Sequence, residues 1–459
     1  MLAKSSQRLA LNTDLYELTM AAGYFDNNLN VPATFEMFIR ELPENRSYLV
    51  SAGLQHVINY ILNLKFEKED IQYLKSLSSF KHVSNDFFNY LSNLNFGGDV
   101  WAMQEGEIFF PGEPMLRVTA PIIQAQIIET FVLSMLNFQT LVATKSTRVV
   151  QTANFDGQKR GVMEFGSRRA HGPEASVLAA RASYIAGCIG TSNVLAGKKF
   201  DIPVYGTAAH SWTLAFESEI KAFQAYNRVF PESTVLLIDT YDIEQGVRNA
   251  IKLGKKFNGV RIDSGDLLEY SRIVRRILDE NGYENVIIIA SGDLNEYKIK
   301  ELVDKKAPID SFGVGTQMVT SEDAPSLGGI YKLVEIEKDG EAQFKAKFSE
   351  DKATYPGKKQ VYRIIDEKGN YQKDVIGLID ENIGKEHETL LQEVIKNGKL
   401  IYKFPELKNI QEKFLRKLEK LNQKYKQLEK PEMYPVEYSE NLQKLFDNLK
   451  EEESKLISQ

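Results

Sequence analysis

The sequence predicts an α/β protein whose parallel strands form a TIM-like barrel, because one local pattern repeats along the middle of the chain. In each repeat a short apolar run ends in a loop of Gly, Ser, Thr, Asp or His, and a helical stretch follows. Seven such strand ends lie between residues 160 and 316, spaced at about the length of a strand plus its crossover helix. Strands that alternate with helices in this way form parallel sheets. No Gly-x-Gly-x-x-Gly motif and no doubly wound strand order is evident, which favours the barrel.

The flanking segments predict a second domain of mixed α+β type. Residues 12–25 begin with a helix-capping signature in which Glu17 lies close to the capping-box position, and residues 33–40 alternate like a strand. Strand-like alternation returns at residues 330–378, which we expect to pair with the N-terminal strands. The predicted division is an α+β segment over 1–121, the barrel with the active site over 122–329, a strand-rich return to the α+β domain over 330–400, and a charged helical segment over 401–459.

Composition excludes several classes of protein. The 57 basic and 63 acidic residues give a formal charge of −6, which argues against a general nucleic-acid or membrane-surface binder. A single cysteine, Cys188, excludes a disulfide framework within the chain and a cysteine-rich zinc site. The first residues lack the apolar segment of a signal peptide, and the most apolar stretch, near 118–142, is interrupted by polar groups. We therefore expect a cytoplasmic protein.

The residues at the strand ends form a consistent chemical set. Arginines suit a carboxylate or phosphate, aspartates suit hydroxyls or a hard divalent cation, and glycines allow backbone amides to cradle a phosphate. His210 follows a tight turn of small residues and is suited to nucleophilic or acid–base chemistry. The set comprises Arg168, Arg169, Arg261, Asp239, Asp242, Asp263, Asp266, Asp293, Gly292, Gly313, Gly315, Thr316 and His210.

Each of these residues also has an ordinary structural explanation. A loop histidine can bond a backbone carbonyl, Ser-Gly-Asp can be a turn with a helix cap, and paired arginines can form salt bridges. Their joint occurrence on one predicted rim is the stronger signal. It indicates a phosphorylated, hydroxyl-bearing substrate such as a sugar phosphate, bound with Mg²⁺. The acceptor group cannot be deduced from these residues alone.

Seven motifs occur in order along the chain: Thr13-Asp-Leu-Tyr-Glu-Leu-Thr-Met, Glu164-Phe-Gly-Ser-Arg-Arg-Ala, Gly190-Thr-Ser-Asn, Pro203-Val-Tyr-Gly-Thr-Ala-Ala-His-Ser, Val260-Arg-Ile-Asp-Ser-Gly-Asp, Gly313-Val-Gly-Thr and Tyr331-Lys-Leu-Val. Together they resemble the nicotinate phosphoribosyltransferase family, in the right order over about residues 12–445. The resemblance implies a type II phosphoribosyltransferase, with a mixed α/β domain, an irregular seven-stranded α/β barrel, and active sites completed across a homodimer interface.

The resemblance implies a reaction of NAD salvage. Nicotinate and phosphoribosyl diphosphate would condense to nicotinate mononucleotide and diphosphate, coupled to ATP hydrolysis and assisted by Mg²⁺. His210 resembles the histidine that ATP phosphorylates in this family. Asp263 resembles the carboxylate that positions the ribosyl group and Mg²⁺.

The resemblance also implies the substrate contacts. The nicotinate ring would lie between Phe165 and Tyr16 from the second subunit, and its carboxylate would meet Arg261. The remaining expected contacts are Arg168 and Thr207 near nicotinate, and Asp14, Arg40, Gly292, Asp293, Gly315, Thr316 and Lys332 around the phosphoribosyl and phosphate groups.

Other functions stay open. In nicotinamide phosphoribosyltransferase an aspartate follows the Gly-Thr of the second strand end, whereas Ser192 stands here, which favours nicotinate. Quinolinate phosphoribosyltransferase is a shorter, decarboxylating enzyme with a more basic pocket. A catalytically silent nucleotide-binding relative would carry a lesion among His210, Arg261 and Asp263, yet all three are present. A barrel aldolase or isomerase would need a lysine or glutamate base at a strand end, and no clear lysine is found there.

Overall fold

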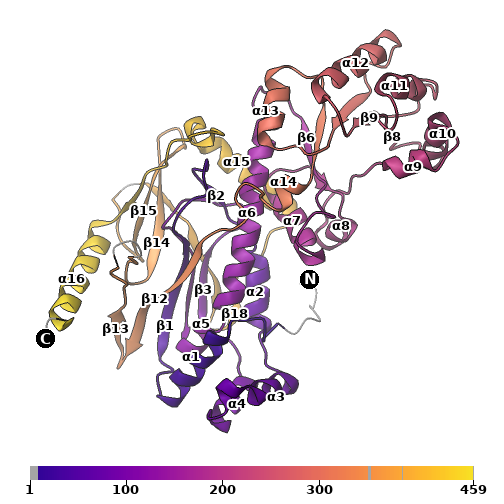
Figure 1. Cartoon of the computed structure of the whole chain (residues 1–459). Coiled ribbons are helices and arrows are strands. Elements are labelled where there is room, and N and C mark those ends of the chain that lie inside the picture. The colour runs from indigo at the N-terminus through magenta and orange to yellow at the C-terminus, as the bar shows by residue number, and fades with distance from the viewer. Residues whose placement is uncertain (1–8, 350–352, 385, 458–459) are drawn as a thin grey trace. The chain divides into compact units, whose positions relative to one another are not determined.

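The computed structural model describes residues 9–349, 353–384 and 386–457 as two compact units. The first unit contains residues 1–140, 326–406 and 416–459, and the second contains residues 141–325 and 407–415. The two colours that meet in the first unit, indigo and orange to yellow, show that segments far apart in the sequence fold together there (Figure 1).

A mainly antiparallel set of strands forms the core of the first unit. The seven-stranded sheet has the order β13-β12-β1-β5-β3-β17-β18. Of the strands expected within residues 330–378, only β12 pairs with an N-terminal strand, lying antiparallel to β1 with Glu36 opposite Lys332. Residues 359–378 instead supply two strands of a separate sheet. The bounds are β1 Pro32–Ile39, β3 Asp99–Met103, β5 Pro114–Pro121, β12 Gly329–Lys338, β13 Glu341–Phe344, β17 Leu391–Lys396 and β18 Lys399–Leu400.

Two smaller sheets and several helices complete this unit. A four-stranded sheet has the order β16-β14-β15-β19, and helix α16 lies against β15 (Figure 1). The bounds are β2 Leu49–Val50, β4 Ile108–Phe109, β14 Lys359–Ile365, β15 Tyr371–Leu378, β16 His387–Thr389, β19 Val436–Tyr438, α1 Leu15–Asp26, α2 Leu54–Asn63, α3 Lys68–Ser76, η1 Ser78–Phe80, α4 Asn85–Ser92, α5 Ile122–Gln126, η2 Gln423–Lys426 and α16 Glu440–Ile457.

The second unit is a parallel α/β structure. Its six-stranded sheet has the order β7-β6-β11-β10-β9-β8, and every ladder is parallel. Helix α10 packs against α11, α11 packs against α12, and α12 packs against β9 (Figure 1). The strands are β6 Gly161–Glu164, β7 Gly190–Thr191, β8 Val235–Leu237, β9 Gly259–Ile262, β10 Ile287–Ala290 and β11 Ser311–Val314. The helices are α7 Pro173–Ile185, α8 Val194–Phe200, α9 His210–Leu214, α10 Glu219–Val229, α11 Ile243–Ile251, α12 Leu267–Glu280, α13 Glu296–Asp304 and α14 Thr316–Val319.

The core of the second unit forms where strand and helix side chains meet. Strand residues such as Val260, Ile288 and Phe312 are almost fully buried, and they join Val247 of α11 and Val274 of α12 in one apolar cluster. Burial of such side chains stabilises a fold by roughly 1.5–3 kcal/mol each relative to leaving them exposed. This core holds the strands in their parallel order.

The expected closed seven-stranded barrel is not confirmed. Six of the seven predicted strand ends belong to the sheet, but the seventh, at Tyr205, is only an isolated parallel bridge between Thr191 and Val204. The edge strands β7 and β8 share no ladder within the described part of the chain. Pro203 lacks an amide donor, and the neighbouring Val204 and Tyr205 are 48% and 40% exposed, so this run has little buried surface to support a full strand.

Helix α6, Glu129–Ala153, is continuous with the apolar stretch singled out in the sequence. Residues Ile122–Ala153 are long and apolar enough by composition to cross a membrane, although the sequence predicted an interruption by polar groups. However, 61% of the most apolar window is buried inside the protein. Its Lys145 is also buried and forms an ion pair with Glu296 at 2.6 Å. These are the properties of a core helix.

Buried charges link the sheets of the first unit. Arg363 on β14 and Asp374 on β15 are both fully buried, and Nη2 lies 2.6 Å from Oδ2. Arg363 also pairs with Glu107 at 3.0 Å, and Tyr434 donates to Asp374 at 3.1 Å. Burial raises the pKa of the nearby Glu113 carboxyl well above its usual value, and the Asp374 charge raises it further.

Replacing Asp374 by Ala is expected to lower the free energy of unfolding by roughly 3–5 kcal/mol, because it leaves the Arg363 guanidinium buried without its main partner. Urea or thermal unfolding measures the loss. The control is Asp304→Ala, which removes an exposed pair with Lys300 and should cost less than about 1 kcal/mol. Equal losses in the two variants would contradict the importance of the buried pair.

Candidate active site

The parallel register brings the predicted residues of the second unit to one edge of the sheet. Loops that follow β6, β8, β9, β10 and β11 all leave from the carboxyl ends of their strands. In open parallel sheets this is the edge where ligands bind. The predicted residues located there are Phe165, Arg168, Thr207, His210, Arg261, Asp263, Gly292, Asp293, Gly315 and Thr316.

His210 begins helix α9, and both of its ring nitrogens face polar groups. Nδ1 lies 3.2 Å from the Thr240 hydroxyl, which follows β8, and Nε2 lies 3.8 Å from Oδ2 of Asp263, which follows β9. The His210 side chain remains 39% exposed. It is therefore oriented by its neighbours and still open to a substrate. Thr240 was not predicted, although its place directly after the Ile238-Asp239 strand end was a usable signal.

Arg261 is a desolvated cation with spare donor capacity. Its Nη1 donates to the Thr207 hydroxyl at 2.6 Å, and Nη2 lies 4.0 Å from Oδ1 of Asp263. Burial lowers the pKa of Arg261, while the carboxylates of Asp263 and Asp239 oppose that shift. Its Nε is buried and has no hydrogen-bond partner among the described residues. An unsatisfied buried guanidinium nitrogen is suited to an anionic ligand group.

Asp263 is held by its neighbours from two adjacent strands. Ser291, after β10, donates to Oδ1 at 2.5 Å, and the Asp263 amide donates to Oδ2 of Asp239 at 2.9 Å. Ser264 also donates to Asp239 at 2.7 Å. Oδ1 of Asp239 is buried and has no hydrogen-bond partner in the described chain. Two carboxylates therefore converge beside His210, one of them with a free oxygen.

The loops after β9 and β10 touch through a glycine. Gly292 has φ +94°, and a Cβ there would lie 1.9 Å from the Asp263 carbonyl oxygen. The next residue, Asp293, is also left-handed, with φ +46°, and its carbonyl accepts from Lys298 at 2.8 Å. Only glycine permits this approach, so Gly292 fixes the spacing between the two loops.

The ring of Phe165 lies close against a second glycine. A Cβ at Gly313 would lie 2.4 Å from the Phe165 ring, and the Phe165 amide donates to Val314 at 2.8 Å. The Phe165 side chain is half-buried, whereas Arg168 farther along the loop is exposed. The charge of Arg168 lowers the pKa of Arg261, so the two guanidinium groups are near enough to repel each other. A ligand anion would relieve that repulsion.

Gly315 and Thr316 begin the short helix α14 after β11. The Gly315 position faces the backbone of the β6 loop, since a Cβ there would lie 3.3 Å from the Phe165 carbonyl oxygen. Both residues are half-buried. They place a small-residue turn beside Phe165.

Four predicted site residues, Asp14, Tyr16, Arg40 and Lys332, belong to the first unit. Asp14 precedes α1, and its carboxylate accepts from the Thr130 hydroxyl at 3.0 Å. Tyr16 is 46% exposed, yet burial of its hydroxyl and the neighbouring Glu129 and Glu17 raise its pKa. Lys332 is half-buried on β12, and Arg40 is half-buried just after β1.

Glu17 departs from its predicted capping role. The structure shows no side-chain cap at the start of α1; instead Gln126 donates to Glu17 at 2.7 Å and to Glu129 at 2.8 Å. Burial, together with the charges of Glu129 and Asp14, raises the pKa of Glu17 to about 7, although the hydrogen bond from Gln126 opposes the shift. Tertiary contacts therefore replaced the local capping bond, and a cluster of carboxyl groups lies beside Tyr16.

The raised pKa of Glu17 predicts that stability falls as the pH rises. The folded protein holds this proton up to about pH 7, whereas the unfolded chain releases it near pH 4.5. The stabilisation is therefore complete below pH 4.5 and is lost as the pH rises through about 7. The loss should reach roughly 1–3 kcal/mol. Urea unfolding between pH 4 and 8 should show this slope in the wild type and a weaker one in Glu17→Gln. Parallel curves would contradict the assignment.

Replacing Gly292 by Ala should disrupt the edge of the sheet, because the new Cβ clashes with the Asp263 backbone in a left-handed conformation. We expect a stability loss of roughly 2 kcal/mol or more, measured by thermal unfolding. Gly328→Ala is the control, since its Cβ would meet nothing within 4 Å. A Gly292 variant as stable as the control would show that the loops are not in close contact.

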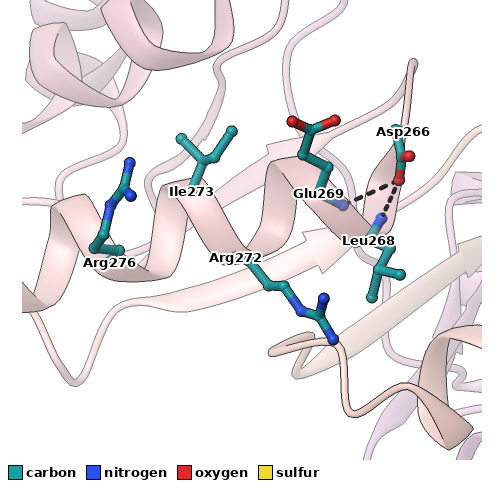
Figure 2. A pocket seen from close by; sticks show the side chains of 6 residues that line it. All are labelled: Asp266, Leu268, Glu269, Arg272, Ile273 and Arg276. Atoms are coloured by element: carbon teal, nitrogen blue, oxygen red, sulfur yellow. Dashed lines mark hydrogen bonds between the residues drawn. The ribbon is translucent and has the colours of Figure 1, made fainter.

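A shallow pocket of about 330 Å³ lies along α12, and none of the strand-end groups just described lines it. Figure 2 shows Asp266 at the start of this helix, where its carboxylate accepts from the amides of Leu268 and Glu269, both at 3.0 Å. The other lining residues, among them Arg272 and Arg276, follow along the same helix. Asp266 therefore serves as a helix cap, and the pocket is the surface of one helix rather than a convergence of strand ends.

Comparison with known families covers most of the chain. The model of the nicotinate phosphoribosyltransferase N-terminal domain matches residues 11–137, and that of the nicotinate phosphoribosyltransferase family matches residues 161–363. The model of the C-terminal domain matches residues 383–446.

Individual relatives agree. The chain is 40% identical to nicotinate phosphoribosyltransferase of Bacillus subtilis, over 94% of this chain and 93% of the relative. It is 44% identical to nicotinate phosphoribosyltransferase pncB2 of Mycobacterium tuberculosis, over 85% of this chain and 83% of the relative. The crystal structure of human nicotinic acid phosphoribosyltransferase superposes with a TM-score of 0.83 at 27% identity, covering 95% of this chain and 99% of that one. The chain therefore belongs to the nicotinate phosphoribosyltransferase family.

Proposed function

We propose that this protein condenses nicotinate with phosphoribosyl diphosphate, giving nicotinate mononucleotide and diphosphate in NAD salvage, with coupled hydrolysis of ATP. The observation that carries the proposal is the group formed by Thr207, His210, Arg261 and Asp263 at one edge of the parallel sheet. Membership of the family over nearly the whole chain supports the same reaction.

Nicotinate binding rests on Arg261 and Phe165. The free Nε of Arg261 would donate to the substrate carboxylate, and Thr207 holds the guanidinium in place at 2.6 Å. The Phe165 ring, supported by Gly313, offers a flat face for the pyridine ring. Ser192 adds no negative charge that would repel the carboxylate. Tyr16 of a second copy of the chain would cover the other face of the ring in a homodimer with shared sites.

The phosphoribosyl group needs both anionic and cationic partners. Displacement at the anomeric carbon develops positive charge on the ribose as diphosphate leaves, and the Asp263 carboxylate would stabilise that charge. Backbone amides near Gly292, Asp293, Gly315 and Thr316 would hold the 5′-phosphate. Asp14, Arg40, Arg168 and Lys332 would complete the binding of the substrates. Holding both reactants in line supplies a large part of the rate enhancement.

The carboxylates beside His210 fit a magnesium ion. Mg²⁺ is usually held by one or two carboxylates together with substrate phosphates, and no group of three or more protein ligands occurs among the described residues. Asp263 and Asp239 would hold it, because Asp239 has a buried oxygen without a partner. Bound there, the ion would neutralise charge on the leaving diphosphate.

His210 would couple ATP to the reaction. A ring nitrogen attacks the γ-phosphorus of ATP, the bond to the β-phosphate oxygen breaks, and ADP leaves. The phosphohistidine places a dianion's worth of charge beside Arg261 and Asp263, which would reorder the surrounding loops before hydrolysis. The proposal places this enzyme in the cytoplasm, which rests on the sequence alone.

A product assay with nicotinate or nicotinamide, each with and without ATP, tests the proposed function. We expect nicotinate mononucleotide as the main product and a higher rate with ATP. His210→Ala should abolish the stimulation by ATP and retain some turnover without it. His82→Ala, at an exposed histidine of the first unit, is the control. Preference for nicotinamide would favour the alternative transferase, and no turnover of either would favour a catalytically silent nucleotide-binding relative.

A further inference from the structure

Glu164, the last residue of β6, is a buried carboxyl group that the proposed chemistry does not use. It is 0% exposed and forms no ion pair within the described chain. Burial raises its pKa, while hydrogen bonds from Thr191 and Gly166 oppose the shift. Burying a carboxyl group without a cationic partner costs free energy unless hydrogen bonds compensate for its lost hydration. The partners of those hydrogen bonds therefore show which segments Glu164 holds.

The bonds of Glu164 connect two loops. One carboxyl oxygen accepts from the Gly166 amide, in the loop that carries Phe165 and Arg168. The other accepts from the Thr191 hydroxyl at 2.5 Å, at the end of β7. The Glu164 carbonyl oxygen also accepts from the Ser192 amide at 2.9 Å. One residue therefore fixes the start of both loops.

Thr191 extends this hydrogen-bond network from Glu164 to the start of α8. Its hydroxyl donates to Glu164 and accepts from the Asn193 amide at 2.9 Å, so its only proton is used toward Glu164. Asn193 in turn caps α8 by accepting from Ala196 at 2.9 Å. Glu164 therefore acts as an acceptor toward both loops.

In the sequence, Phe165 lies between Glu164 and Gly166, the two residues that one of these hydrogen bonds joins. A Cβ at Gly166 would meet Val319 at 2.3 Å and Glu164 at 3.0 Å, so the loop is also packed tightly against the Val319 side chain. The direction of the Phe165 ring over Gly313 therefore depends on the Glu164 contact.

We propose that Glu164 and Thr191 are positioning residues that hold the Phe165 loop and the Ser192 loop in register for the pyridine substrate. This inference rests on the proposed function, since it assigns the Phe165 face to nicotinate. Among the described residues, neither side chain forms a hydrogen bond to the phosphate-binding turns at Gly292 or Thr316. Loss of the pair should therefore raise KM for nicotinate more than KM for phosphoribosyl diphosphate.

Glu164→Gln is the sharpest variant, because it keeps shape and removes one acceptor. If the amide nitrogen of Gln faces Thr191, it can donate to that hydroxyl, but the Thr191 proton then loses the acceptor that Glu164 provides. If it faces Gly166, it meets an amide donor. Either way a donor that Glu164 satisfies in the wild type, the Thr191 proton or the Gly166 amide, loses its acceptor, and we expect KM for nicotinate to rise on the order of tenfold. Thr191→Val should act similarly, and Thr191→Ser should restore the wild-type value.

Thr147→Val is the matched control. Thr147 is also a buried threonine of this unit, but its hydroxyl has no hydrogen-bond partner among the described residues. Thermal unfolding of each variant separates positioning from stability, since a purely structural role would lower the melting temperature without altering the ratio of the two KM values. Hydrogen exchange at the Gly166 amide gives a second readout and should accelerate in Glu164→Gln.

The outcomes are distinct. A selective rise in KM for nicotinate in Glu164→Gln and Thr191→Val, restored in Thr191→Ser and absent in Thr147→Val, supports the inference. Unchanged KM values, or equal rises for both substrates, would overturn it while the proposed function stands. A wild-type protein that does not use nicotinate would overturn the proposed function and this inference with it.

Discussion

The all-parallel pairing of the six strands in the second unit is the constraint on which its site depends. Because neighbouring strands run in the same direction, their carboxyl ends lie at one edge, and short loops deliver Phe165, Asp239, Asp263 and Ser291 to the same place. None of these residues is near another in sequence. The hydrogen bonds from Ser291 to Asp263 and from Asp263 to Asp239 each cross between adjacent strand ends. Parallel pairing in the register observed makes those bonds possible.

Burial determines the electrostatics of this edge more than pairwise charge does. Burial is the largest influence on the pKa of Arg261 and on that of Glu164, in opposite directions because one is a base and the other an acid. Arg261 keeps an unsatisfied donor, which suits an incoming anion. Glu164 has its acceptors filled by Thr191 and Gly166, which suits a structural support. Two buried ionisable groups thus serve different purposes according to whether their hydrogen bonds are complete.

Each unit also contains buried ion pairs that join elements distant in the sequence. In the second unit Lys145 on α6 meets Glu296 at 2.6 Å and Asp323 at 2.8 Å, which links the start of α13 to the segment after α14. In the first unit Arg363 connects β14 to Asp374 on β15 and to Glu107. Such pairs stabilise little in a net sense, but they penalise any arrangement that separates the partners. They therefore specify which elements lie together.

The sequence by itself determined the parallel α/β class and six of the strand ends, because these follow from local hydrophobic period and loop chemistry. Of the predicted pairing of residues 330–378 with the N-terminal strands, it was right only for the first strand. It also identified His210, Arg261 and Asp263 as residues of one edge. Only the tertiary structure decided that the strand segment at Tyr205 is reduced to a bridge and that Glu17 turns from the helix start toward Gln126. It also decided that Thr240 lies against His210 and that Glu164 accepts from Thr191. Those outcomes depend on burial and on partners distant in the chain, and no local pattern carries that information.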